Sequence, residues 1–202
     1  MFLRQIDLQS RYPRFREDVA LASMSAIFII PVNAPPDVDL SGLAEVLSFT
    51  FRLPTMISQM QLNPEFAYNP SRAQYNSTDI LATLLKNRPE GVLRVLGVTD
   101  VDLFIPVLTF VFGEAQLDGP AALVSTHRLR NQFYGMPKDG ALLQARLEKE
   151  AVHELAHTFG LVHCPDQACV LNSSTYVENI DLKEKNFCTN CLVLLAQKQS
   201  TS

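Results

Sequence analysis

Three of the four histidines of this 202-residue chain lie between residues 153 and 163, and their spacing constrains the local fold more than any other feature. His153 and His157 are four residues apart, so on an α-helix both imidazole rings lie on one face and can bind one metal ion. Gly160 can leave helical geometry because it has no Cβ atom, and the turned chain can bring His163 back to the same ion. The pattern predicts a helix, a glycine turn and a three-histidine metal site.

Three protein ligands leave the fourth tetrahedral position free for water or substrate, which is typical of a catalytic zinc ion. Glu154 lies beside that position and can act as general base, although it can also be read as a surface carboxylate. The alternative for the histidines is that core or surface residues fall in register by chance. Chance would then also have to place Glu154, Gly160 and His163 correctly, so we predict a catalytic zinc site.

The four cysteines form a second candidate metal site. They are arranged as two short-spaced pairs separated by a loop: Cys164 with Cys169, and Cys188 with Cys191. This spacing is close to that of a tetrahedral four-thiolate site, so we expect one structural zinc ion and two zinc ions per chain in total. Two disulfides are the alternative. A redox pair formed by Cys188 and Cys191 alone would leave the other two cysteines unexplained.

Composition is that of an ordinary globular protein, with 47% hydrophobic and 19% charged residues. The length favours one domain over residues 1–202, with an α/β part over about residues 1–160 and a zinc-binding part over about residues 161–202. The net charge of -4 and the lack of a Lys/Arg-rich run exclude nucleic acid as an expected partner.

The N-terminal sequence gives an expectation about location. Residues 1–7 lack the apolar core and cleavage site of a signal peptide, so we expect a cytoplasmic protein in a reducing compartment, which argues against disulfides. The one candidate membrane run, residues 19–32, is interrupted by Ser23 and Ser25. It is also shorter than the ~20 residues that a spanning helix needs, so no membrane partner is expected.

Apolar runs and helix-like patterns alternate along the chain, which predicts an α/β fold. We expect strands over residues 25–32, 53–62, 92–98, 107–112 and 121–126, and helices over 40–51, from Asn76 onward, and over 140–159 with Asp139 as cap. An apolar stripe on the last helix lies opposite His153 and His157, so one face packs while the other binds metal. After Gly160 we expect little regular structure, and metal binding must supply much of the folding free energy there.

The extended histidine motif, from His153 to His163, resembles that of the metzincin metalloproteases. The four cysteines that follow look like those of the archaemetzincin family. Residues 74–78, 97–104 and 110–113 are also similar to stretches of that family, so the resemblance covers most of the chain from about residue 25. It implies a compact metzincin-like α/β domain with a twisted mixed sheet, an active-site helix and a C-terminal segment that a second zinc ion holds together. It also implies metallopeptidase activity.

One position departs from the family pattern. Where the archaemetzincins have a methionine beneath the zinc, two residues after the second cysteine, this chain has Leu171. That methionine is an apolar floor and not a ligand. Exchange between methionine and leucine nearly conserves volume and costs less than roughly 1.5 kcal/mol, so we expect the site to survive.

The leading hypothesis is a zinc metallopeptidase that acts on peptides or proteins. Zinc lowers the pKa of a bound water toward about 7, Glu154 takes the proton of this water, and Glu154 returns it to the leaving amine. The alternative is a zinc-stabilised binding protein of the same fold with little or no turnover. The sequence does not distinguish aminopeptidase from endopeptidase action, because Asp100, Asp102 and Glu150 are equally open as carboxylates that could grip a free amine.

Two further residues and one strand are weaker candidates. Tyr176 could donate to developing negative charge on the substrate, or it could be a packed or surface tyrosine. His127 is expected to be structural or exposed. The strand over residues 121–126 is either an open sheet edge that pairs with extended substrate or an ordinary edge strand.

Overall fold

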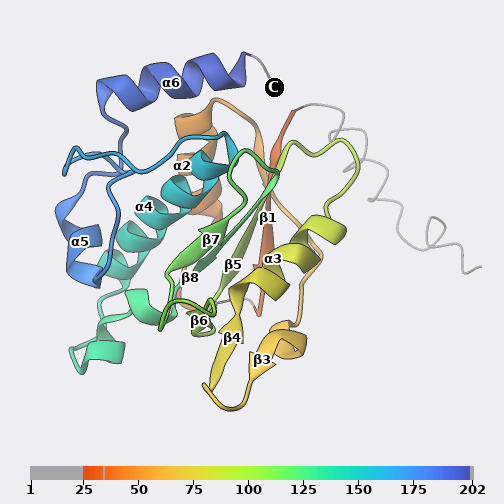
Figure 1. Cartoon of the computed structure of the whole chain (residues 1–202), viewed down its shortest axis with the longest axis vertical. Helices are drawn as coiled ribbons and strands as arrows, with labels where there is room; N and C mark the ends of the chain where they lie inside the picture. Colours follow the sequence, from red (N-terminus) through yellow and green to blue (C-terminus); the bar gives the residue numbers. More distant parts are fainter. Residues whose placement is uncertain (1–24, 34, 201–202) are drawn as a thin grey trace, which may run out of the picture.

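The computed structural model describes residues 25–33 and 35–200, which form three layers (Figure 1). A five-stranded sheet is the middle layer, and helices cover both of its faces. A second, smaller sheet has three strands. The main sheet consists of β1 (Ile27–Val32), β2 (Thr55–Ile57), β5 (Arg94–Thr99), β7 (Gly113–Ala115) and β8 (Ala121–Ser125). The small sheet consists of β3 (Tyr68–Asn69), β4 (Gln74–Asn76) and β6 (Leu103–Phe104).

Helices pack on both faces of the main sheet, and further helices lie in the C-terminal part of the chain. The α-helices are α2 (Leu40–Phe51), α3 (Ser77–Lys86), α4 (Gly140–Thr158), α5 (Val177–Leu182) and α6 (Thr189–Gln199). Short 3₁₀ helices are η2 (Pro64–Ala67), η3 (His127–Leu129) and η4 (Asn131–Tyr134). The mixed α/β fold predicted from the sequence is confirmed.

Two hydrophobic cores lie on opposite faces of the main sheet. On one face, apolar side chains of α2 and α4 pack against residues such as Ile29 and Leu96. On the other face, side chains of α3 pack against residues such as Ile30 and Val95. Consecutive residues of β1 and β5 therefore serve different cores, which explains why both strands are buried along their whole length.

The strand order of the main sheet is β2-β1-β5-β8-β7, and β7 at the edge runs antiparallel to its neighbour. The other three pairs are parallel, with β1 pairing β2 and β5, and β5 pairing β8. The loop over residues 116–120 joins β7 to β8 and brings Gly113 opposite Val124. This geometry makes β7 the open edge next to α4, with which it is in contact.

Most predicted elements are confirmed. The helix over residues 40–51 has the predicted bounds, and the strands over residues 25–32, 92–98 and 121–126 agree with β1, β5 and β8 to within two residues. The side chain of Asn76 accepts a hydrogen bond from the N–H of Thr78 and begins α3. Asp139 caps α4 in the same way, by accepting from the N–H of Leu142.

Two predicted strands are wrong in part or in full. Residues 107–112 form a turn and an isolated bridge, and the strand begins only at Gly113. The reason is that the carbonyls of Leu108 and Thr109 accept hydrogen bonds from the side chain of Arg72, and that of Thr109 also from Gln74. Side-chain donors thus bond to these carbonyls in place of the backbone N–H groups of a neighbouring strand. Within residues 53–62, only Thr55–Ile57 form a strand.

Two further expectations are also corrected. The strand β8 is not an edge, because it lies between β5 and β7. The segment after Gly160 is more regular than predicted, since it contains α5 and α6. Residues 1–7, on which the prediction about a signal peptide depends, lie outside the described residues. No helix within residues 25–33 and 35–200 is both long and apolar enough to cross a membrane.

Candidate metal centres

Helix α4 presents two of the three clustered histidines on one face. Its apolar stripe of Leu147, Ala151 and Leu155 is fully buried, which fixes the rotation of the helix about its axis. His153 and His157 consequently project together, and their ring centroids lie 4.7 Å apart. The packing of the helix therefore sets the direction of both imidazoles, as the sequence pattern predicted.

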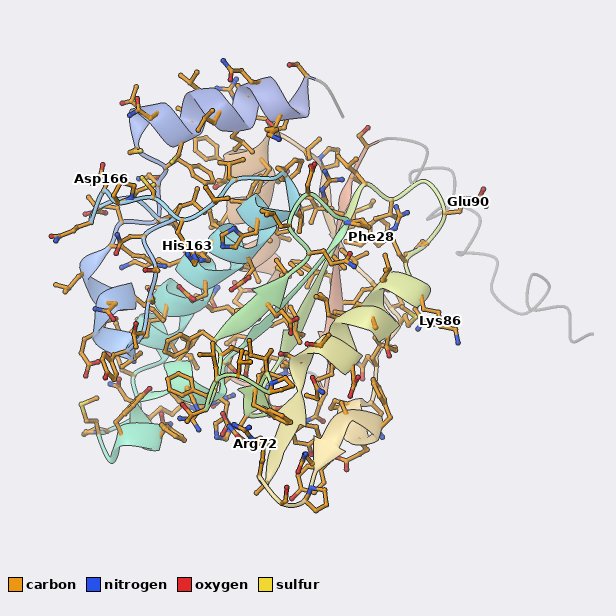
Figure 2. All side chains as sticks on the ribbon, viewed as in Figure 1. Phe28, Arg72, Lys86, Glu90, His163 and Asp166 are labelled. Atoms are coloured by element: carbon orange, nitrogen blue, oxygen red, sulfur yellow. The ribbon has the colours of Figure 1, made fainter. Side chains whose placement is uncertain are left out.

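A glycine turn brings the third histidine back to this pair. Gly160 has a φ of 80°, in the left-handed region that favours glycine. Its N–H donates to the carbonyl of His157, and the N–H of Leu161 donates to that of Ala156, which closes the end of α4. The ring of His163 then lies 5.2 Å from that of His153 and 5.0 Å from that of His157. Figure 2 shows His163 beside helix α4.

Backbone carbonyls fix the tautomer of two of these rings. Nδ1 of His153 lies 2.9 Å from the carbonyl oxygen of Val170, and Nδ1 of His157 lies 2.7 Å from that of Leu161. A carbonyl can only accept, so each Nδ1 carries the proton and donates. The Nε2 atoms are then bare, and they lie 3.1 Å apart. Two lone pairs at this distance repel each other unless a cation lies between them.

The donor set fits a zinc ion. One nitrogen from each ring lies within 4.8 Å of the others. A tetrahedral zinc ion with nitrogens at about 2.0–2.1 Å needs them roughly 3.4 Å apart, which small rotations of the rings would achieve. Burial lowers the pKa of His153 well below its usual value, and it also lowers the pKa of His157. Both rings are therefore neutral at pH 7, which is the form that binds metal.

Glu154 lies next to these rings on the buried side of the cleft. Its side chain packs against Gly113 of β7, where a Cβ atom would lie 2.6 Å from Cγ of Glu154. Burial raises the pKa of Glu154 well above its usual value, and the neighbouring carboxylate of Glu150 raises it further, while Lys183 opposes these effects. A carboxyl group with a raised pKa is suited to taking up and returning a proton near neutral pH.

A cleft of about 300 Å³ opens in front of the histidines and Glu154. Residues 108–113 form one wall, residues 173–175 form another, and Glu150, His153, Glu154 and His163 also line it. The first wall is mostly apolar and includes Leu108 and Phe110, whereas Ser173 and its neighbours are polar. The cleft thus combines an apolar wall, a candidate metal site and a buried carboxylate, which is a combination suited to hydrolysis of a bound peptide.

The four cysteines form one compact cluster. A sulfur atom from each lies within 4.8 Å of the other three, and Sγ of Cys164 lies 3.8 Å from Sγ of Cys188. All four thiols are free in the structure, and their convergence favours one metal site over two separate disulfides. Burial raises the pKa of Cys191, whereas a hydrogen bond to the backbone of Cys191 lowers the pKa of Cys188.

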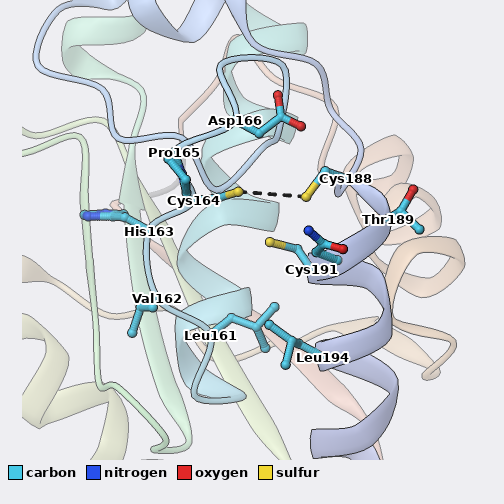
Figure 3. Close-up of a pocket in the computed structure, with 11 residues that line it drawn as sticks. Leu161, Val162, His163, Cys164, Pro165, Asp166, Cys188, Thr189, Cys191 and Leu194 are labelled. Atoms are coloured by element: carbon cyan, nitrogen blue, oxygen red, sulfur yellow. Dashed lines mark hydrogen bonds between the residues drawn. The ribbon is translucent and has the colours of Figure 1, made fainter.

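The two clusters are joined by one peptide bond. Figure 3 shows His163 pointing to one side of the chain while Cys164 points to the other, toward Cys188 and Cys191. A cavity of about 510 Å³ lies between this segment and α6, and both His163 and Cys164 are among the residues that line it. A change in the cysteine cluster is therefore expected to alter the position of His163 in the histidine cluster.

Other residues singled out from the sequence are not brought to the histidines by a described contact. Tyr176 is 66% exposed and begins α5. His127 donates from Nδ1 to the carbonyl of Asp100 and stacks edge-on against Phe133. Asp102 forms a bidentate ion pair with Arg128. Of the three carboxylates considered for a free amine, Glu150 alone lines the cleft.

Sequence reasoning missed two residues beside the site. Lys183 is 1% exposed and contacts both Glu150 and His153. It was overlooked because it belongs to the charged run Lys183-Glu184-Lys185, which is typical of a solvated face. Gly113 entered the sequence analysis only as part of the stretch 110–113 that is similar to the archaemetzincins, although its missing side chain is what leaves room for Glu154.

Comparison with known proteins identifies the family. The model of peptidase family M54 matches residues 38–197. The archaemetzincin of Methanocaldococcus jannaschii is 40% identical over 172 residues, which cover 85% of this chain and 93% of that protein. The chain belongs to peptidase family M54. As a member of this family, it is a zinc metallopeptidase, and the predicted resemblance to the archaemetzincins is confirmed.

Solved structures agree with the M54 assignment. The crystal structure of the archaemetzincin of Methanopyrus kandleri superimposes with a TM-score of 0.76 at 35% identity, over 87% of this chain and 96% of that one. A zinc-dependent peptidase of Methanocorpusculum labreanum has a TM-score of 0.73 at 28% identity, over 84% of this chain and all of that one (100%). The three-layer fold described above is therefore that of the M54 peptidases.

Proposed function

We propose that this M54 peptidase hydrolyses peptide bonds in the cleft in front of α4, with His153, His157 and His163 as the ligands of a catalytic zinc ion. The observation that carries this proposal is the convergence of one nitrogen from each ring within 4.8 Å, next to a buried carboxylate. When bound, the zinc ion supplies a Lewis acid that polarises the scissile carbonyl and acidifies water.

Glu154 is the proposed general base and general acid. Its carboxylate accepts a proton from the attacking water and later donates this proton to the nitrogen of the leaving amine. Contact with Gly113 on one side and the packing of α4 on the other hold the carboxylate at the floor of the cleft. A residue in this role contributes on the order of 10²–10⁴-fold to the rate.

Extended substrate is proposed to bind along β7. This strand is the antiparallel edge of the main sheet, and its first residue, Gly113, lines the cleft. An edge strand offers backbone N–H and C=O groups to an added strand, so a peptide can align beside it with its scissile bond near Glu154. This role replaces the one that the sequence pattern suggested for β8.

The four cysteines are proposed to hold a second, structural zinc ion, which makes two zinc ions per chain. Closed four-thiolate coordination leaves no position for substrate, so this ion would stabilise the C-terminal part and not react. Residues 1–202 are then one peptidase domain, in which the part from about residue 161 completes the site by supplying His163. Cytoplasmic location and the absence of nucleic-acid and membrane partners stay predictions.

A diverse peptide library tests the proposed reaction. The wild-type protein with both metal sites filled is compared with E154Q, and the zinc content of each is measured. Cleavage by the wild type that E154Q loses at full zinc content supports the peptidase mechanism. No cleavage by either protein supports the alternative of a zinc-stabilised binding protein. The positions of the cleaved bonds separate aminopeptidase from endopeptidase action.

A further inference from the structure

Lys183 is the most deeply buried ammonium group near the candidate active site. It follows α5 directly and is 1% exposed. Burial of a charged group is costly unless partners compensate for it, and an apolar side chain of similar volume would fill the same space more cheaply. The presence of a lysine here therefore points to a role beyond filling the core.

The ammonium group of Lys183 contacts His153 and two further groups beside it. Nζ lies 2.8 Å from Oε1 of Glu150, donates to the carbonyl of Asn172 at 3.2 Å, and lies 3.4 Å from Nδ1 of His153. Oε1 of Glu150 has no hydrogen bond of good geometry to any described residue, so its contact with Lys183 is a charge interaction. Lys183 thus joins helix α4 to the segment that contains Asn172.

The same segment orients the ring of His153. The carbonyl of Val170 accepts the Nδ1 proton of His153, and this proton is what leaves Nε2 bare for a metal ion. Because Nδ1 carries its proton and donates it to Val170, it cannot also accept a hydrogen bond from Lys183 in this tautomer. Lys183 must then act on His153 indirectly, by holding residues 170–172 against α4.

We propose that Lys183 is a positioning residue of the catalytic metal site. It ties the segment 170–172 to Glu150 and so keeps the carbonyl of Val170 in line with Nδ1 of His153. This inference rests on the proposed function, since it assumes that His153 is a zinc ligand. Partners that hydrogen-bond a metal ligand typically change metal affinity about 10–100-fold when they are lost, and we expect an effect of that order when the carbonyl of Val170 loses its alignment with His153.

Other contacts hold the same region in place, so Lys183 can be replaced without loss of the fold. Arg146 of α4 forms a bidentate ion pair with Asp181 of α5, with Nη2 and Oδ2 2.6 Å apart. Lys149 also donates to the carbonyl of Ile180. Helix α5 is therefore held on α4 without Lys183, and we expect Lys183 variants to keep the overall fold.

The chain also provides a matched control. Lys185 lies two residues further on and pairs with Glu148 of α4 at 2.8 Å. This pair joins the same segment to the same helix with the same kind of charges, but its side chains are 42% and 15% exposed and contact neither His153 nor Asn172. Loss of Lys185 removes an ion pair of the same type without disturbing residues 170–172.

The experiment compares K183M, the double variant E150M/K183M and K185M with the wild type. Each is depleted of metal and titrated with Co²⁺, whose absorption distinguishes a three-histidine site from a four-thiolate site, and zinc affinity is then measured by chelator competition. We expect K183M and E150M/K183M to bind metal about 10–100-fold more weakly at the histidine site, with an altered Co²⁺ spectrum there. The thiolate site and K185M should match the wild type.

The double variant separates positioning from simple loss of a charge partner. Methionine at both positions removes the uncompensated carboxylate that K183M alone would leave behind. If metal affinity returns to the wild-type value in E150M/K183M, or if K183M never loses it, the proposal is wrong. Failure of the wild type to bind Co²⁺ through its histidines would instead contradict the proposed function itself.

Discussion

Gly113 of the edge strand β7 lies directly against the side chain of Glu154 on helix α4. A Cβ atom at position 113 would lie 2.6 Å from Cγ and 2.7 Å from Oε1 of Glu154. Glycine at this position thus leaves space for the carboxylate at the floor of the cleft. Strand β7 and helix α4 thus pack closely at the carboxylate that we propose as general base.

We expect G113A to bind zinc normally but to lose about 100-fold in kcat, because displacement of a catalytic group by about 1 Å has an effect of that order. The added Cβ would also approach the carbonyl oxygen of Leu123, so the melting temperature is measured alongside kcat and zinc content. The control is G140A, since a Cβ at position 140 meets nothing within 4 Å. Unchanged kcat in folded G113A would refute the positioning role of this glycine.

The stability of the metal-free protein should depend on pH through Glu154. Its pKa is raised in the folded state by burial, so folding favours the protonated form. The resulting stability is present below the pKa of the unfolded state, near 4.5, and is lost as pH rises through the folded-state pKa. We therefore expect metal-free E154Q to be more stable than the metal-free wild type at pH 7–8.

Chemical unfolding of both metal-free proteins over a range of pH measures this effect. The advantage of E154Q should shrink toward zero as the pH falls to about 4.5, because glutamine is neutral throughout. The same substitution removes the proposed general base, so the more stable protein should be the inactive one. A constant difference in the free energy of unfolding across this range would show that Glu154 does not titrate with a raised pKa.

The cysteine cluster should support the histidine cluster through the peptide bond between His163 and Cys164. Removing one thiolate by C164S or C188S should weaken the structural site and loosen the segment that presents His163. We expect about a tenfold loss of zinc affinity at the histidine site as well. Chelator competition with separate quantification of the two sites checks this, and full occupancy of the histidine site in both variants would exclude the coupling.

Leu171 should be an adequate replacement for methionine. Its side chain is fully buried, while its carbonyl accepts a hydrogen bond from the N–H of Cys164, a contact that does not depend on the side chain. We expect L171M to change the free energy of unfolding by less than about 1.5 kcal/mol and to leave zinc affinity unaltered. Urea unfolding and chelator competition measure the two quantities. A large gain in zinc affinity would show that leucine distorts the ligands.

Helix α4, which carries two of the proposed zinc ligands, could be predicted from the sequence because its determinants are local. The spacing of His153 and His157, the apolar stripe behind them and Gly160 all act within a few turns of one helix. The same holds for the caps Asn76 and Asp139, whose side chains bond to N–H groups two or three residues away. Patterns of this kind need no knowledge of the rest of the chain.

The identity of the edge strand and the burial of Lys183 were decided only by tertiary structure. A central strand and an edge strand can have the same apolar sequence pattern, so the sequence alone did not show that β7 lies at the edge next to β8. It also did not show that carbonyls within residues 107–112 accept hydrogen bonds from the side chains of Arg72 and Gln74. Lys183 belongs to a charged run and is nevertheless buried, because Glu150 of α4 and the carbonyl of Asn172 contact it after folding. Contacts between separate segments depend on which surfaces meet after folding, and a local sequence pattern does not specify them.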